Sequence, residues 1–236
     1  VPLSDNADDL ELHLNASDST SYDPDTDTTT WTDIVGSNDA TMTSMGVANF
    51  DKDNGGYFSF DGGSDYATVS YDDSIYMTSN TGFTIEAWVN RDSNSEMYVI
   101  ASADNSTYPY ALSWNSTTHG WLGWISGSSF TSSSRAGLSE NTTLGTGKWE
   151  HVVLTQSSSD RKNRLYVNGV LTSTSLATTG FQSTSSDVHI GAYHNLTGKF
   201  DGKIGAVRIY SKELSASEVG QNYRHGRDYI YTELNG

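Results

Sequence analysis

Carboxylate side chains are the first candidates for chemistry in this sequence, because Asp and Glu together number 29. Cleavage of a glycosidic bond requires two carboxyl groups about 5 to 9 Å apart, one as acid and one as nucleophile or base. On a strand, such a pair would occupy alternate positions of one face. Glu86 is instead followed on its face by Trp88, and Glu150 by Val152. We therefore expect no catalytic residues of this kind, and a glycoside hydrolase or lyase is the least favoured function.

Histidine and serine chemistry is not indicated either. The chain has no Gly-x-Ser-x-Gly segment, the turn that exposes a nucleophilic serine in many hydrolases, and no cysteine for thiolate ligands. His119, His189 and His194 are not spaced like the ligands of a zinc site. We expect His151 to be structural and Glu86 to be hydrogen-bonded within the sheet, because a buried carboxylate needs partners.

Aromatic side chains are the stronger candidates, and they are concentrated in residues 108–127, YPYALSWNSTTHGWLGWISG. Sugar binding uses flat apolar rings that stack on C–H surfaces, with a few polar groups that bind hydroxyls. The alternation places Trp121 and Trp124 on opposite faces of one strand. Two interpretations remain open: the tryptophans fill the core, or some of them form a shallow sugar platform. The candidate carbohydrate-binding residues are Trp114, Trp124, Trp121, Tyr108, Asp104 and Tyr193.

The elements that must position these residues are short strands. Apolar residues alternate with polar ones in runs at 10–14, 57–60, 66–69, 83–89, 98–101, 110–114, 121–125, 149–155, 164–167, 188–191 and 204–210. Turn-forming residues separate the runs, and Asn168-Gly169 is the strongest hairpin signal because a type I′ turn needs positive φ at both positions. The spacing predicts an antiparallel all-β domain, and a single domain of 236 residues is within the usual range for such folds.

One helical segment is expected near the C-terminus. Ser215 is a suitable N-cap, and Glu218 completes a capping box three residues later. The pattern predicts a short helical turn over residues 215–223 that packs on the sheet, followed by a polar tail or edge strand at 226–236.

The net charge of -16 limits the possible partners. Such a surface repels phosphate backbones and anionic membranes, so we expect no binding to nucleic acid. The longest apolar runs are only a few residues, so we expect no membrane insertion. Acidic side chains do make divalent cations such as calcium plausible ligands.

Five motifs in order give the sequence its resemblance to a family. They are LELHLN, FSFDG, FTIEAWVN, GKWEHVVLTQ with RLYVNGVL, and KIGAVRIYSKELSASEV. In this order they resemble the laminin-G-like, concanavalin A-like lectin/glucanase domains, of the kind seen on phage and marine microbial surface proteins. The resemblance implies a two-sheet antiparallel jelly-roll β-sandwich over residues 1–236, with a core at about 8–223. It also implies that the last strand leads directly into a short helical turn.

The resemblance also raises the question of a structural calcium ion. Relatives often hold one with an Asp at the start of the last strand, where this sequence has Gly205 and Ala206. Backbone oxygens near Gly62 and Gly205, together with Asp61 or Asp65, are the remaining candidate ligands.

The favoured function is therefore a non-catalytic module that binds a glycan or cell-surface polysaccharide, in a protein of the extracellular space or virion surface. The alternative is a structural domain, such as a capsid decoration, fibre or adhesin, that binds other virion or surface proteins instead.

Overall fold

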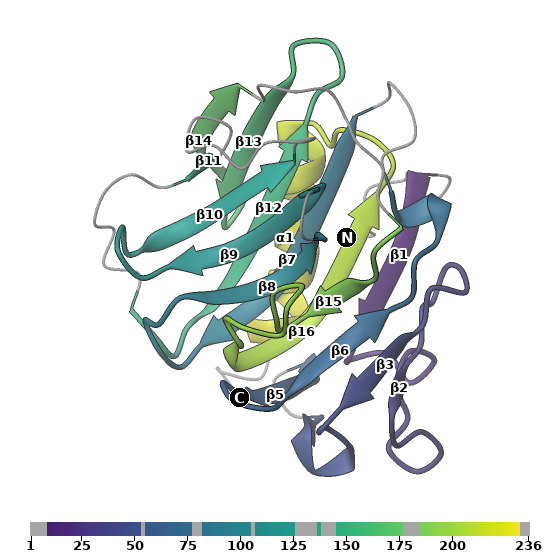
Figure 1. Ribbon diagram of the computed structural model, residues 1–236. Helices are drawn as coiled ribbons and strands as arrows, with labels where there is room; N and C mark the ends of the chain where they lie inside the picture. Colours follow the sequence, from purple (N-terminus) through teal and green to yellow (C-terminus); the bar gives the residue numbers. More distant parts are fainter. Residues whose placement is uncertain are drawn as a thin grey trace.

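The computed structural model describes residues 9–52, 55–76, 82–104, 107–125, 136–137, 145–176 and 185–231. Within these ranges the chain forms two antiparallel sheets that face each other and one α-helix that lies outside them (Figure 1). The all-β sandwich expected from the sequence is confirmed.

Sheet A has eight described strands, seven of them in the order β14-β13-β12-β7-β16-β5-β4. The eighth, β1, pairs with residues 206–210 of β16, after the residues 201–204 that pair with β5. Its strands are β1 (Leu10–Asn15), β4 (Phe50–Asp51), β5 (Tyr57–Asp61), β7 (Phe83–Arg91), β12 (Trp149–Gln156), β13 (Lys162–Val167), β14 (Val170–Leu176) and β16 (Asp201–Tyr210). The central strands β7 and β16 are buried over nearly their whole length, because sheet B covers one face and other elements cover the opposite face.

Sheet B also has eight described strands, in the order β11-β10-β9-β8-β15-β6-β3-β2. They are β2 (Thr30–Trp31), β3 (Ala40–Thr43), β6 (Tyr66–Val69), β8 (Met97–Ser102), β9 (Tyr110–Asn115), β10 (Gly120–Ile125), β11 (Ala136–Gly137) and β15 (Val188–Ile190). In the described part of the chain, the 3-10 helices η2 (Val47–Asn49) and η4 (Asp73–Ile75) lie between strands.

The main core fills the space between the two sheets. In β7, Phe83, Ile85, Ala87 and Val89 alternate toward this core, and all are buried. Their neighbours on the strand point to the opposite, outer face of sheet A, as the two-residue period of a strand requires.

The hairpin predicted at Asn168-Gly169 is confirmed. Val167 of β13 pairs with Val170 of β14, and the two turn residues have φ values of 52° and 78°. Positive φ at both positions is the condition for a type I′ turn.

The helix α1 (Ala216–Tyr231) begins as predicted and continues further. Ser215 Oγ accepts from the Glu218 N–H at 3.3 Å, and Glu218 Oε2 accepts from the Ser215 N–H at 2.7 Å, which is the expected capping box. The helix has 16 residues instead of about nine, so residues 226–231 are helical and the predicted tail was wrong for them. In the part of the chain that is described, no helix combines the length and apolar character of a membrane span.

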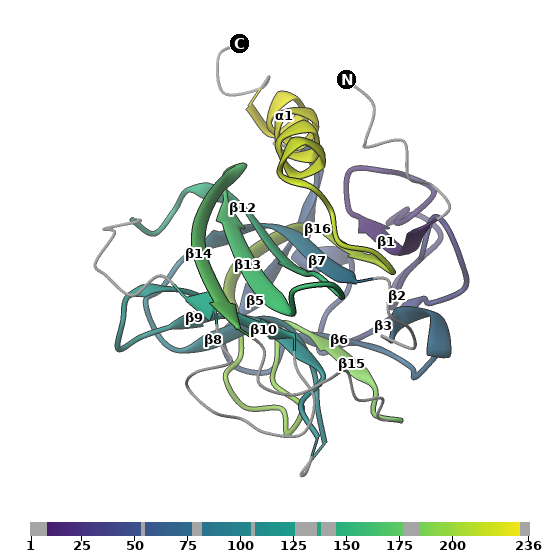
Figure 2. The ribbon, with the colours of Figure 1, turned by 90° about the horizontal axis from the view of Figure 1, so that it is seen from above.

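Helix α1 covers the outer face of sheet A, as the view from above shows (Figure 2). Gly226 explains how it approaches so closely, because a Cβ there would lie 2.2 Å from Trp88 Nε1. Tyr223 stacks on the same indole, with ring centroids 5.8 Å apart and an interplanar angle of 11°. The helix is therefore part of the packed structure.

Candidate carbohydrate-binding face

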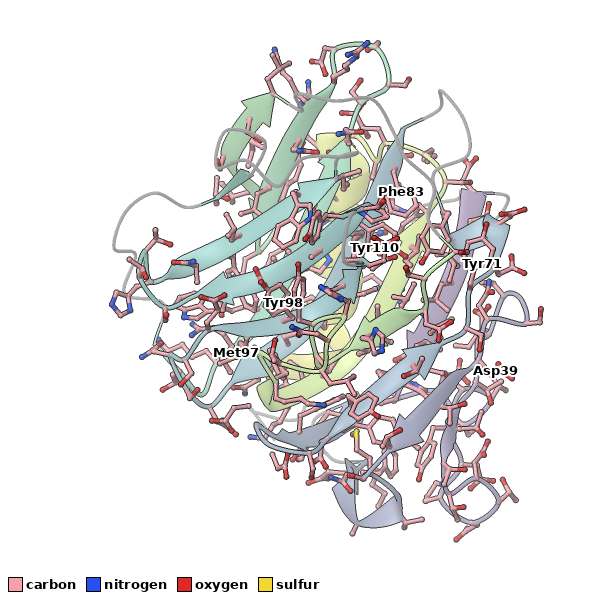
Figure 3. The ribbon with its side chains drawn as sticks, in the orientation of Figure 1. Asp39, Tyr71, Phe83, Met97, Tyr98 and Tyr110 are labelled. Atoms are coloured by element: carbon pink, nitrogen blue, oxygen red, sulfur yellow. The ribbon has the colours of Figure 1, made fainter. Side chains whose placement is uncertain are left out.

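The outer face of sheet B, directed away from sheet A, gathers four of the six residues proposed for sugar binding. We call it the sheet B face and define it by its ring-bearing residues: Tyr66, Tyr98, Tyr108, Trp124, His189, Tyr193 and His194. Tyr98 lies in the middle of this face, in β8 (Figure 3).

Trp114 and Trp121 are on the opposite side of sheet B and belong to the main core. Both rings are buried, and they meet edge to face with centroids 5.6 Å apart. The Arg91 guanidinium lies 3.3 Å from the centroid of the Trp114 ring. For these two residues the structure supports the core interpretation, because a ring enclosed between the sheets offers no surface to a sugar.

Trp124 does point outward, but only 2% of its surface is exposed. It packs with Ala101 and Ala111 and meets the Tyr98 ring edge to face at 6.2 Å. In this arrangement Trp124 supports Tyr98 from the side and does not itself present an open ring.

The segment 191–200 brings Tyr193 onto this face. The Tyr193 ring stacks on Tyr98, with centroids 4.5 Å apart and an interplanar angle of 29°. The segment is tied to β8 because the Tyr98 N–H donates to the Gly198 carbonyl at 2.9 Å. It also closes on itself, since Tyr193 N–H donates to the Thr197 carbonyl at 2.9 Å. The half-buried Tyr193 ring is thus held in one place by stacking and by backbone hydrogen bonds.

Polar groups stand next to the stacked tyrosines. The His194 ring is 4.3 Å from that of Tyr193 and 6.3 Å from that of Tyr108. Burial lowers the pKa of His194, and the charge of Asp104 opposes this shift. Asp104 Oδ1 accepts from the Thr107 N–H at 2.6 Å, which fixes the carboxylate at the end of β8.

Sequence reasoning missed the other half of the face. Tyr66 and His189 lie on adjacent strands β6 and β15, with ring centroids 6.2 Å apart, and Lys199 Nζ sits 3.7 Å above the Tyr66 ring. The alternation in residues 66–69 and 188–190 does carry a signal for Tyr66 and His189, since both occupy the non-core positions of their strands. The position of Lys199 depends on the fold of segment 191–200.

Asp61 and Asp65, the residues considered for calcium, organise a turn. Asp61 Oδ1 accepts from the backbone N–H groups of Gly63, Ser64 and Asp65, and the bonds from Gly63 and Asp65 chiefly lower the pKa of Asp61 to about 2. Asp65 Oδ2 accepts from Asn49 and from the Asp61 N–H.

These residues do not fit a cation site. Gly205, the other proposed participant, lies against Gly56 and Trp149, and its carbonyl accepts from Ala16. Within the described ranges, no three His, Asp or Glu side chains gather in a way that could hold a metal ion.

The two glutamates considered for catalysis, Glu86 and Glu150, lie on opposite faces of sheet A. Glu150 points into the main core, where its carboxylate is 3.4 Å from Arg91 Nε, and burial raises its pKa. Glu86 points to the outer face. The sheet separates the two carboxylates, so they cannot act together on one bond.

Glu86 is the centre of a buried polar network under α1. Its carboxylate accepts from Arg208 Nη1 at 2.5 Å and from Asn222 Nδ2 at 2.7 Å. Burial alone would raise its pKa, but the positive charge of Arg208 and the other partners hold the pKa below its ordinary value. His151 Nε2 lies 3.2 Å from the carboxylate without hydrogen-bond alignment, and its ring is tilted by 32° against that of Trp88, with centroids 5.0 Å apart. Glu86 is therefore hydrogen-bonded, as predicted, and His151 is packed in the interior beside it.

A family model described as the concanavalin A-like lectin/glucanases superfamily, Laminin_G_3, matches residues 61–220. The chain belongs to this family. None of the curated proteins compared with the chain matches it.

Solved structures extend the match of this lectin/glucanase-family chain to nearly its whole length. Trypanosoma rangeli sialidase is 20% identical with a TM-score of 0.61, over 95% of this chain and 34% of the sialidase. The binding domain of botulinum neurotoxin DC in complex with SialylT is 15% identical with a TM-score of 0.68, over 93% of this chain and 52% of that one. The same domain with rat synaptotagmin II gives 15% and 0.67. At these identities the likeness is one of fold, and the chain spans about a third to a half of these proteins.

Proposed function

We propose that this chain is a non-catalytic module that recognises carbohydrate through the sheet B face. The observation that carries the proposal is the stack of Tyr193 on Tyr98, which holds a half-buried aromatic ring at a fixed position on a sheet. A pre-positioned ring is what stacking on a sugar requires, because little side-chain entropy remains to be lost on binding.

Hydrogen-bonding groups surround this ring on several sides. Asp104 and His194 stand at one end of the face, and Lys199 and His189 stand at the other. A carboxylate, two imidazoles and an ammonium offer both acceptors and donors to sugar hydroxyls. Among the similar structures, one toxin domain is recorded with SialylT, which makes a glycan ligand a reasonable choice for this fold.

A glycan array, followed by electrophoresis in gels containing the polysaccharides that score, tests the proposal. We expect at least one glycan to bind the native chain and Tyr193→Ala to weaken that binding at least tenfold. Tyr71→Ala is the matched control, because Tyr71 is an exposed aromatic residue two positions after the end of β6, away from Tyr98 (Figure 3). Retained binding by Tyr193→Ala would exclude the sheet B face as the site.

An assembly role is the second candidate, and one observation favours it. The edge strand β14 exposes Val170, Leu171 and Leu176 to 64%, 48% and 58%. Exposed apolar residues on an edge strand are typical of surfaces that pair with another protein. No binding to any glycan, together with a stable oligomer in size-exclusion chromatography that Leu171→Lys dissociates, would favour this role.

The proposed setting is the extracellular space or a virion surface, where such modules meet polysaccharides and other surface proteins. The separation of Glu86 and Glu150 by the sheet supports a binding role over hydrolysis. Release of reducing sugar from a panel of polysaccharides would overturn that part of the proposal.

A further inference from the structure

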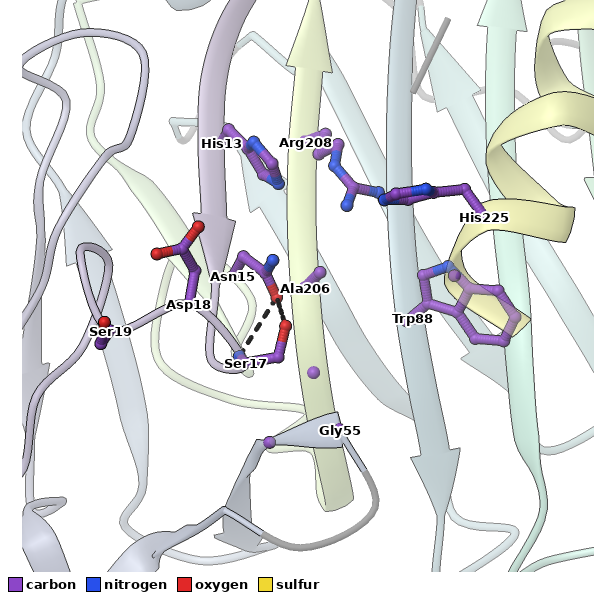
Figure 4. A pocket seen from close by; sticks show the side chains of 13 residues that line it. His13, Asn15, Ser17, Asp18, Ser19, Gly55, Trp88, Ala206, Arg208 and His225 are labelled. Carbon is purple, nitrogen blue, oxygen red and sulfur yellow. Dashed lines mark hydrogen bonds between the residues drawn. The ribbon is translucent and has the colours of Figure 1, made fainter. Parts of the chain in front are cut away.

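A second binding site is indicated on the opposite side of the molecule, where α1 does not fully cover sheet A. A cleft of about 510 Å3 opens there between the helix, the strands β1 and β16, and the chain around residues 17–19 (Figure 4). Its volume is within the range of about 300 to 1,000 Å3 that small-molecule sites occupy. This cleft is on the outer side of sheet A and the sheet B face is on the outer side of sheet B. Both sheets lie between them, so the two sites are separate.

The inner end of the cleft carries polar atoms without partners. His13 of β1 is 92% buried, and its Nε2 makes no hydrogen bond to any described residue. Arg208 Nε and Trp88 Nε1 are also buried without a partner in the described chain. Figure 4 shows His13 directed from β1 toward β16, and Arg208 directed away from His13, toward His225 of α1. Buried polar groups are usually paired in folded proteins, and these three line a cleft, so a ligand in the cleft could supply their partners.

The character of these atoms defines the ligand. Arg208 Nε and Trp88 Nε1 can only donate, so they require oxygen acceptors. Toward the mouth, Asn15, Ser17 and Asp18 line the cleft, and their oxygens can receive hydroxyl hydrogens. A ligand with many hydroxyl groups satisfies both ends, because each hydroxyl donates and accepts.

The charges favour an uncharged ligand. Arg208 is already neutralised by Glu86 at 2.5 Å, and Asp18 adds a negative charge to the lining. Burial holds the pKa of His13 down to about 2, so its imidazole adds no positive charge. An anion would therefore meet no uncompensated cation among these three groups.

We propose that this cleft binds a neutral mono- or disaccharide through His13, Arg208 and Trp88, independently of the sheet B face. The two glycine-rich edges, Gly55-Gly56 and Gly205, let the backbone form one side of the cleft without side chains. Recognition here uses hydrogen bonds in an enclosed space, since the Trp88 ring face is taken by the stacked Tyr223.

The test follows the indole N–H signal of Trp88 in 1H–15N spectra of the full chain, assigned by its loss in Trp88→Phe. The probes are cellobiose, lactose and N,N′-diacetylchitobiose, with glucuronic acid and N-acetylneuraminic acid as charged comparisons. We expect a neutral probe to shift the signal in a saturable way. Ala206→Leu, which narrows the cleft without removing a polar group, and His13→Gln should each weaken that effect at least tenfold.

Three results would overturn the inference. They are no saturable shift with any neutral probe at millimolar concentration, a shift with the charged sugars alone, and equal binding by both variants with native-like melting curves. Tyr193→Ala serves as the control that separates the two sites, because it should weaken binding at the sheet B face at least tenfold and leave the Trp88 response unchanged. Failure of one proposal is therefore distinguishable from failure of the other.

Discussion

Both outer faces of the sandwich are formed by the strand residues that point away from the core, but these residues differ in exposure between the two sheets. On sheet B, alternate strand residues such as Tyr66 and His189 remain half-buried and carry rings at the surface. On sheet A, the corresponding positions, including Glu86 and Trp88, are buried next to α1. The strand alternation therefore determines which residues point away from the main core. Whether these residues are exposed or buried depends on a further element, here α1, that packs over them.

The largest expected effect lies in the interior beneath α1. Glu86→Gln leaves Arg208 buried without its counter-charge, and loss of one member of a buried ion pair costs about 3 to 5 kcal/mol. Urea unfolding measures this. Glu213→Gln, in the partly exposed pair with Arg164 at 2.7 Å, is the control and should cost at most about 1 kcal/mol. Equal losses of stability from the two changes would contradict the burial of the Glu86–Arg208 pair beneath α1.

Removal of the close approach of α1 should have the next largest effect. Gly226→Ala would place a Cβ 2.2 Å from Trp88 Nε1, so the helix must shift, at a cost of about 2 to 3 kcal/mol in the free energy of unfolding. Gly220→Ala is the matched control, because its Cβ would meet only the end of the Arg224 side chain at 3.4 Å. It should leave stability unchanged or raise it by up to about 1 kcal/mol. A tolerated Gly226→Ala would contradict the tight packing of the helix.

The pH dependence of stability should reveal the buried His13 on the outer face of sheet A. His13 has a folded pKa of about 2 against 6.5 when unfolded, so below pH 6.5 the unfolded chain takes up the proton and stability falls. At pH 5 the loss from His13 amounts to about 2 kcal/mol. Comparison of the native chain with His13→Gln from pH 7.5 to 5 isolates this contribution. Parallel curves for the two proteins would refute the burial of a neutral His13.

The smallest expected effect is on the displayed face. Tyr193→Ala removes a stacked ring from a surface loop, so it should lower stability by only about 1 kcal/mol. A thermal melt measures the change, and Tyr71→Ala provides the comparison. A loss as large as that of Glu86→Gln would show that Tyr193 is structural and that the contrast between the faces fails.

Much of the fold could be predicted because its signals are local. The capping box of Ser215 and Glu218 and the Asn168-Gly169 turn each need only neighbouring residues. The length of α1 could not be predicted, since Gly220 and Gly226 weaken the helical pattern. Only the position of Trp88 beneath the helix explains why Gly226 is there.

The site depended more on long-range geometry. The alternation separated Trp121 from Trp124, but it could not say which of them faces sheet A. Tyr193 reaches Tyr98 through the path of segment 191–200, and His13 meets Arg208 because β1 pairs with β16. Neither contact leaves a trace in the residues next to it.

Mapping of a bound glycan on the whole chain tests the central claim most directly. With the best ligand from the array, chemical-shift changes should concentrate on Tyr98, Asp104, Tyr108, Tyr193 and His194. Changes confined to the edge strand β14, or the absence of any saturable change with every glycan that the array identifies, would contradict it.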